Sequence, residues 1–316
     1  MIFYNDWLYL QNDRLLFNGH YDLSSISHKK LNDISRFNSE KVFKNLGSKP
    51  VFCLSGGIDS QAAYQLLDKI YNFDVVIFEF ANGLNSDEVN DAKRFANEYG
   101  IDYKVVTQDV LRFLHFDLIS FSKRFKISSP QFAVFAFFCE ELKSMGYTGA
   151  IFSGNGFVLE KENVTFALTK AQLLDLHNYS SKEFPIISNF LGFTQEMCLK
   201  ISFSTPIIYQ ERTYEPVELN VTEHLREKKL NMLSRYENKI KTYENLGLYI
   251  IPQKEKKTGF EQLKEKVGQM YNDGWYFEKA FRKPLYNLHP NYNIATDMPK
   301  LLISDILDYS KKLAIS

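Results

Sequence analysis

The sequence predicts an α/β protein, in which a doubly wound parallel sheet follows an N-terminal β-hairpin and precedes a mostly helical lobe. Two observations lead to this fold class. Short apolar runs alternate with segments of helical periodicity between residues 49 and 165, and the alternation stops beyond about residue 165. Helices of ten or more residues between strands supply the crossovers that parallel strands require. We therefore expect a hairpin and linker at 1–48, an α/β domain at 49–165 and a helical lobe at 166–316.

The N-terminal residues have the pattern of a β-hairpin. Apolar and polar side chains alternate around Gln11-Asn12-Asp13-Arg14, with Trp7–Leu10 before this turn and Leu15–Phe17 after it. A polar stretch rich in Ser and Lys then extends to about Lys49. We interpret this stretch as a linker to the α/β domain.

The α/β domain begins with a buried strand at 51–54, which a Gly-Gly turn connects to a helix at 61–70. The pattern then repeats along the chain. The further expected elements are a strand at 75–78, a helix at 87–99, a strand at 103–106, a helical stretch at 110–121, a helix from Ser129-Pro130 to about 145 and a strand at 149–152. In the second lobe, helices are expected at 170–179, 222–246, 259–271 and 300–312.

The composition indicates a globular protein of a reducing compartment. The chain has 316 residues, 45% of them hydrophobic, and 38 basic side chains balance 38 acidic ones. No net charge draws it toward nucleic acid or an anionic membrane, although a local basic patch could still bind nucleic acid. Three scattered cysteines argue against disulfides and structural zinc. Without a bilayer-spanning apolar run or a signal-like start, the expected location is the cytoplasm, and the oligomeric state stays open.

One motif carries the chemistry: Ser55-Gly56-Gly57-Ile58-Asp59-Ser60, between the first strand and helix of the α/β domain. Glycines allow backbone N–H groups to approach an anion, serine hydroxyls can donate to it, and a helix N-terminus favours negative charge. A carboxylate would repel bare phosphate, so Asp59 is the candidate ligand of a Mg²⁺ that bridges phosphates. The alternative is a structural turn in which Asp59 or Ser60 caps the helix.

The motif resembles the S-G-G-x-D-S signature of the PP-loop (N-type) ATP pyrophosphatases, which release AMP and pyrophosphate. The closest likeness is to the synthetase domain of asparagine synthetases, β-lactam synthetases and lasso-peptide cyclases. Three further stretches are similar to that family: 80–100 with its D-E-x-x-x-A helix, Ile151–Gly156 with its S-G-x-G turn, and Lys256–Phe260 with its K-x-G-F element. The resemblance implies an adenine nucleotide α-hydrolase-like fold.

The resemblance also implies a set of binding residues for ATP and Mg²⁺. The pyrophosphate and its metal would be held by the loop, adenine by the backbone near Phe78–Phe80, and the α-phosphate would face the turn after the fourth strand. Lys257 would neutralise charge on the departing pyrophosphate, unless Gln253–Lys257 is a solvated loop or Lys256 acts instead. The implied residues are Ser55, Gly56, Gly57, Asp59 and Ser60 of the loop, Phe80, Gly154 and Lys257.

Two departures from that family change what we expect. Its turn continues as G-E-G-x-D-E, whereas this chain reads Gly154-Asn155-Gly156-Phe157-Val158-Leu159, and Glu160 or Glu162 would have to replace the missing acidic pair. Its asparagine synthetases also carry a glutaminase domain headed by cysteine, whereas residue 2 is Ile and only about 48 residues precede the α/β domain that contains the loop. We therefore expect no glutaminase domain and no glutamine-derived ammonia from this chain.

The leading function is an AMP- and pyrophosphate-forming synthetase, which adenylates a small-molecule carboxylate or a carbonyl oxygen for attack by an amine. A second class is a PP-loop enzyme that modifies a nucleobase or transfers sulfur to tRNA, for which Cys53 beside the loop would be a candidate. A third class is a non-catalytic nucleotide-binding module, which the missing acidic pair favours. Substrate and nucleophile cannot be identified from the sequence.

Overall fold

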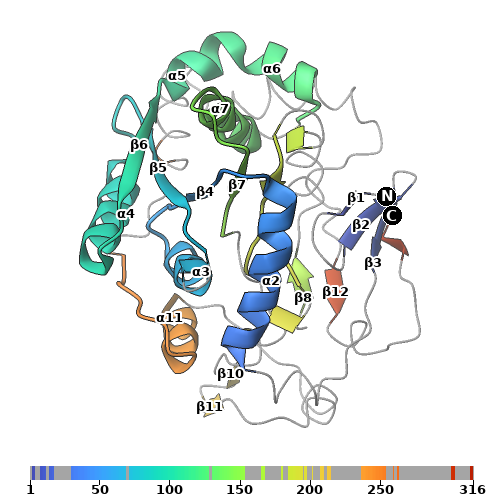
Figure 1. The fold of residues 1–316 in the computed structure, drawn as a ribbon, viewed down its shortest axis with the longest axis vertical. Coiled ribbons are helices and arrows are strands. Elements are labelled where there is room, and N and C mark those ends of the chain that lie inside the picture. Colours follow the sequence, from blue (N-terminus) through green and yellow to red (C-terminus); the bar gives the residue numbers. More distant parts are fainter. Residues whose placement is uncertain are drawn as a thin grey trace.

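The structure is a computed structural model that describes residues 2–3, 8–11, 14–17, 30–68, 71–127, 130–153, 165–167, 179–180, 184–194, 196–197, 201, 207–209, 212–214, 236–253, 259, 262, 300–302 and 314–315 (Figure 1). Its centre is a five-stranded sheet with the strand order β6-β5-β4-β7-β9. All four pairings are parallel. The predicted parallel α/β fold is therefore confirmed. The strands are β4 (Pro50–Cys53), β5 (Asp74–Phe80), β6 (Tyr103–Gln108), β7 (Gly149–Ile151) and β9 (Ile186–Ile187).

Helices cover both faces of this sheet. Because side chains alternate along a strand, Phe52 packs with α2, α3 and α4 on one face, whereas Val51 and Cys53 pack with α6 and α7 on the other. The helices are α2 (Leu31–Leu46), α3 (Ile58–Asp68), α4 (Ser86–Tyr99), α5 (Val110–Arg112), α6 (Leu118–Phe125), α7 (Pro130–Ser144) and α11 (Tyr236–Asn245), with a π-helical turn at Phe113–Asp117 between α5 and α6.

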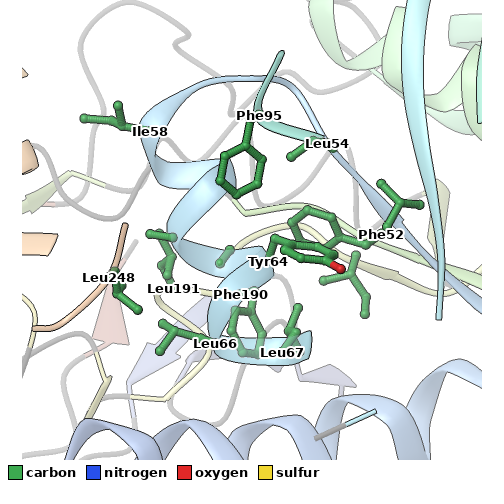
Figure 2. Packing of buried hydrophobic residues seen from close by; sticks show 14 of the residues in the cluster. Phe52, Leu54, Ile58, Tyr64, Leu66, Leu67, Phe95, Phe190, Leu191 and Leu248 are labelled. Atoms are coloured by element: carbon green, nitrogen blue, oxygen red, sulfur yellow. The ribbon is translucent and has the colours of Figure 1, made fainter. Parts of the chain in front are cut away.

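The core around α3 fixes the helix that begins in the S-G-G-I-D-S loop. Figure 2 shows Phe52, Tyr64 and Phe95 grouped on one side of α3 and Leu248 on the other. The Tyr64 ring meets Phe52 and Phe95 edge-on, with ring centroids 5.9 and 6.2 Å apart. Aromatic burial of this kind supplies much of the energy of a core. The loop therefore rests on a helix that is packed along its whole length.

Smaller sheets lie outside the central one. The predicted hairpin is confirmed, because β2 (Leu8–Gln11) pairs antiparallel with β3 (Arg14–Phe17) and joins a four-stranded sheet of order β1-β2-β3-β13. The remaining pairs, β8 with β12 and β10 with β11, are antiparallel. The additional bounds are β1 (Ile2–Phe3), β8 (Thr165–Ala167), β10 (Ile207–Tyr209), β11 (Arg212–Tyr214), β12 (Lys300–Leu302) and β13 (Ala314–Ile315).

The structure differs from the sequence prediction in three places. The stretch interpreted as a linker contains α2, a helix of 16 residues. The prediction of a helix at 300–312 is wrong for its first three residues, because Lys300–Leu302 is a strand that pairs with β8. Local periodicity cannot reveal such a long-range pairing. The central sheet also takes its fifth strand, β9, from the part assigned to the second lobe. Within the described ranges, no helix is long and apolar enough to span a membrane.

Candidate functional site

The Ser55–Ser60 loop lies at the point where the sheet changes its direction of winding. The chain proceeds from β4 to β5 and β6 on one side, and β7 then pairs with β4 on the other side. The carboxyl ends of β4 and β7 are therefore neighbours. Open α/β sheets bind ligands in the crevice outside the strand ends at this switch point. The loop occupies that position because it directly follows β4.

The two glycines of the loop have different roles. Gly56 has φ of 74°, and a Cβ there would lie 2.5 Å from the Ala92 backbone N and 2.8 Å from the Glu88 backbone O. Gly56 is thus required by its backbone conformation and by contact with α4. Among the described residues, a Cβ on Gly57 would meet nothing closer than the Ser55 Oγ, at 3.6 Å. No packing within the described chain therefore requires glycine at this position, in contrast to Gly56.

Ser60 holds the loop together from within. Its side chain is 1% exposed, and its Oγ accepts a hydrogen bond of 3.0 Å from the Ser55 N–H. The Ser60 and Gln61 N–H groups both donate to the Gly57 carbonyl, at 2.9 and 3.0 Å. Gly57 is therefore the residue whose carbonyl starts α3, whereas Ser55 is exposed and can reach a ligand.

Asp59 lies in the first turn of α3 and is half-buried. Because α3 begins at Ile58, Asp59 and Ser60 lie inside the helix and not at its cap. The Tyr243 hydroxyl donates to the Asp59 Oδ1 over 2.5 Å. Burial raises the pKa of Tyr243, and the neighbouring Asp59 carboxylate raises that pKa further, so the phenol stays protonated as a donor. One Asp59 oxygen is thus oriented by α11, 184 residues away.

The backbone of Phe78–Phe80, which is expected to receive adenine, is hydrogen-bonded to the side chain of Asn85. Asn85 Nδ2 donates to the Phe78 carbonyl, and the Phe80 N–H donates to Asn85 Oδ1, each over 2.8 Å. Asn85 thereby closes the carboxyl end of β5, and its buried side chain does not cap α4. The Phe80 ring is also buried, 6.0 Å from Phe138. A nucleotide that binds this backbone must share it with Asn85 or displace that side chain.

The carboxyl end of β7 lies beside that of β4. The Phe190 N–H donates to the Phe152 carbonyl over 3.0 Å, and the Leu191 N–H donates to the Ser153 carbonyl over 3.2 Å. Residues 184–194 therefore fix the path of the chain as far as Ser153. Gly154, Glu160 and Glu162 lie outside the described residues, as do Lys256 and Lys257.

Two described residues flank the lysine pair and contact α4 or its N-terminus. On one side, Arg94 Nη2 donates to the Pro252 carbonyl over 2.7 Å. On the other, the Gly259 N–H donates to Glu88 Oε2 over 2.7 Å, and a Cβ on Gly259 would lie 2.1 Å from the Asn85 Cβ. Gly259 of the K-x-G-F element therefore needs to be glycine. It lies against the same residue, Glu88, whose backbone oxygen contacts Gly56.

Sequence reasoning missed the residues that connect α3 with the chain after α11. Gln61 and Gln65 bind the backbone of Ile251 and Tyr249. Both glutamines are buried. The signal in the sequence was two glutamines at i and i+4 beside Ala62, Ala63, Leu66 and Leu67, where buried polar side chains need specific partners.

The alternative chemistry is less well supported by the described residues. Cys53 and Cys139 are buried free thiols, and burial raises the pKa of Cys53 well above its ordinary value. A thiol that stays protonated is a poor nucleophile. No cluster of three metal-binding His, Cys, Asp or Glu side chains occurs in the part of the chain that the structure describes. A Mg²⁺ that bridges phosphates takes only one or two carboxylates from a protein, so such a cluster is not needed for the metal expected at Asp59.

Comparisons with known proteins found one family model and similar solved structures. The family model for asparagine synthase matches residues 48–156, and no curated protein matches the chain. An NH3-dependent NAD synthetase from Campylobacter jejuni subsp. jejuni is 22% identical over 42% of this chain, with a TM-score of 0.27. The U34-tRNA thiolase NcsA from Methanococcus maripaludis is 15% identical over 83% of this chain and 80% of its own, with a TM-score of 0.31.

These two structures carry no functional argument, because their TM-scores are low. The chain spans only 56% of the NAD synthetase. The family match, in contrast, begins just before β4 and ends just after β7, so it contains the loop and the carboxyl ends of both strands. Residues 48–156 are therefore similar to the asparagine synthase family over the part of the chain that contains the loop.

Proposed function

We propose that this chain is an ATP-dependent synthetase that forms AMP and pyrophosphate, and that it adenylates a carboxylate or carbonyl oxygen for attack by an amine. The observation that carries the proposal is the open position beside Gly57, at the switch point of the sheet and the N-terminus of α3. Backbone N–H groups and a helix dipole favour an anion there. The family match over 48–156 supports the same use of ATP.

The reaction requires little covalent chemistry from the protein. A carboxylate oxygen attacks the α-phosphorus, the bond to the β-phosphate breaks, and pyrophosphate leaves with the bonding electrons. An amine then attacks the acyl-adenylate carbon and loses a proton, and AMP leaves. The loop would hold the pyrophosphate in place, and Asp59 would hold a Mg²⁺ that screens the phosphate charge. Catalysis then comes from position and electrostatics.

The flanks of the lysine pair support a role for Lys257. Gly259 is bound to Glu88, which also contacts Gly56 of the loop. Lys257 comes only two residues before Gly259 in the sequence, a separation of at most about 7 Å for an extended chain, so its proposed role needs no long connection to α4. We expect Lys257→Met to lower kcat by roughly 10²–10³, as for the loss of one transition-state contact. Lys256→Met is the matched control, and equal losses in both variants would contradict the assignment.

The proposed partners are a small-molecule carboxylate and an amine. Nucleobase modification and sulfur transfer are alternatives, and the buried Cys53 weighs against the second of them. A non-catalytic module would bind Mg·ATP without turning it over. Turnover is the property that separates this alternative from the enzyme classes.

The experiment is exchange of labelled pyrophosphate into ATP with a panel of carboxylic and amino acids. A synthetase should show exchange that depends on one acid, with AMP as the nucleotide product. Asp59→Asn should lose exchange while its melting temperature stays near that of the unmodified protein. ADP and orthophosphate as products would overturn the proposal. Activity that appears only with added tRNA would favour the nucleobase-modifying class.

A further inference from the structure

Gln61 connects the loop with a distant part of the chain through a single side chain. Its Nε2 donates to the Gly56 carbonyl and to the Ile251 carbonyl, each over 2.9 Å. Its Oε1 accepts from the Ile251 N–H over 2.8 Å. The side chain is 1% exposed. Both amide hydrogens of Gln61 are thus donated to backbone carbonyls, one in the loop and one in the residue 190 positions later.

Gln65 makes the same pair of contacts one helical turn later. Its Nε2 donates to the Tyr249 carbonyl over 2.6 Å, and its Oε1 accepts from the Tyr249 N–H over 2.9 Å. The two pairs of contacts match in length. Gln61 and Gln65 lie about 6 Å apart along the helix axis, and their partners Ile251 and Tyr249 lie about 6.6 Å apart in an extended chain. Gln65 otherwise donates to the Gln61 carbonyl, and none of its hydrogen bonds in the described chain reaches the loop.

The backbone of segment 248–252 is therefore bound to α3 through glutamine side chains at every second residue. Leu248, Ile250 and Ile251 are buried, with exposed fractions of 4%, 6% and 9%, while Tyr249 is exposed. Figure 1 shows α11, which leads into this segment, beside α3. The segment continues through Pro252 into the lysine pair. Its position is set mainly by two glutamines and by apolar packing.

We propose that Gln61 is a positioning residue that couples the conformation of the pyrophosphate loop to the path of residues 248–253. This inference rests on the proposed function. A ligand that fixes the Gly56–Gly57 backbone also fixes the acceptor of Gln61 Nε2. The same amide holds Ile251, so ligand binding and placement of the chain that leads to Lys256 and Lys257 change together.

The test compares Gln61→Met with the matched control Gln65→Met. Both substitutions keep a flexible apolar stem and remove the amide. We expect faster amide hydrogen exchange in Gln61→Met within both 54–61 and 248–253, without nucleotide present. Gln65→Met should accelerate exchange in 248–253 alone. Identical exchange patterns in the two variants, with residues 54–61 unaffected, would refute the coupling.

A functional readout follows from the same pair. We expect Gln61→Met to weaken Mg·ATP binding by about tenfold, the effect of roughly one lost hydrogen bond. Gln65→Met should stay within about twofold. Failure of the unmodified protein to bind Mg·ATP would refute the proposed function, whereas the exchange measured without nucleotide would still decide the coupling.

An isosteric variant covers the case in which Gln61→Met does not fold. Gln61→Glu retains the acceptor for the Ile251 N–H, but when ionised it places an oxygen against the Gly56 and Ile251 carbonyls. When protonated, it regains one donor. Exchange in 54–61 should therefore slow as pH is lowered, after correction for the intrinsic pH dependence of exchange. A corrected rate that does not change with pH, or that changes equally in Gln65→Glu, would refute the proposal.

Discussion

The two loop glycines allow a sharp test of what the loop does, because alanine at Gly56 should lower the stability of the fold, whereas alanine at Gly57 should weaken ATP binding. In Gly56→Ala the methyl group would lie 2.5 Å from the Ala92 backbone N, at φ of 74°. The left-handed conformation costs about 1–2 kcal/mol for a non-glycine residue. Overpacking against rigid backbone costs about 1–3 kcal/mol more. We expect Gly56→Ala to lose roughly 2–5 kcal/mol of unfolding free energy, a large part of the roughly 5–15 kcal/mol that stabilises a domain.

Gly57→Ala should instead leave the fold intact and weaken ATP binding. Among the described residues, its methyl group would meet only the Ser55 Oγ, at an ordinary contact distance of 3.6 Å. Exchanging glycine for alanine at the start of a helix costs about 1 kcal/mol or less. The same methyl group would occupy the space proposed for pyrophosphate. Loss of one charge-assisted hydrogen bond, about 1.5–3 kcal/mol, corresponds to roughly 10–100-fold weaker binding.

The assay is urea unfolding combined with titration of Mg·ATP for both variants. Stability should separate Gly56→Ala from the unmodified protein, and affinity should separate Gly57→Ala from it. Unchanged Mg·ATP affinity in Gly57→Ala would refute the position of the pyrophosphate. A large loss of stability in that variant would refute the assignment of its space to a ligand.

Three further predictions concern ionisable side chains. Tyr243→Phe removes the hydrogen bond to Asp59 and should lower the unfolding free energy by about 1–2 kcal/mol in urea titrations. Asp59→Asn keeps an acceptor for the Tyr243 hydroxyl, so it should lose pyrophosphate release with little change in stability. Hydrogen bonds from Tyr147 and Lys104 lower the pKa of Asp74 from 3.8. Asp74→Asn should therefore lower the unfolding free energy above about pH 4, and the difference from the unmodified protein should shrink as the pH falls further. Because the side chain is partly exposed, the loss should stay below about 1 kcal/mol. Cys53 should resist alkylation at pH 8 until the protein unfolds, as followed by mass spectrometry, because burial raises its pKa.

The central sheet could be predicted because its elements carry strong local patterns. β4, β5 and β6 lie within two or three residues of the expected strands, and the Gly-Gly turn was placed correctly between β4 and α3. The sequence places the loop between the first strand and helix of the domain, whereas its position at the switch point depends on the strand order that the structure shows. Strand order itself depends on pairings across the chain, such as Phe52 with Ile151. The alternation of strands and helices restricts these pairings strongly.

The helix α2 could not be recognised, because its buried face is partly polar. Ser35, Asn38 and Ser39 are buried beside Ile34 and Val42, and such a face gives little apolar periodicity. The Ser35 hydroxyl donates to the Leu66 carbonyl, and Asn38 Nδ2 donates to Thr194 Oγ1. These partners are far away in sequence. A buried polar helix face is predictable only when its partners are known.

The same reasoning explains why the late segment could not be placed from its own sequence. Residues 248–259 have no strong periodicity, and the contacts that hold Tyr249, Ile251, Pro252 and Gly259 come from α3 and α4. Gln61 and Gln65 bind the backbone before the lysine pair, and Glu88 binds the Gly259 N–H after it. Backbone contacts of this kind place little demand on the side chains that they hold. The only local signals near Lys257 in the sequence are therefore its charge and Gly259, the glycine that fits against Asn85.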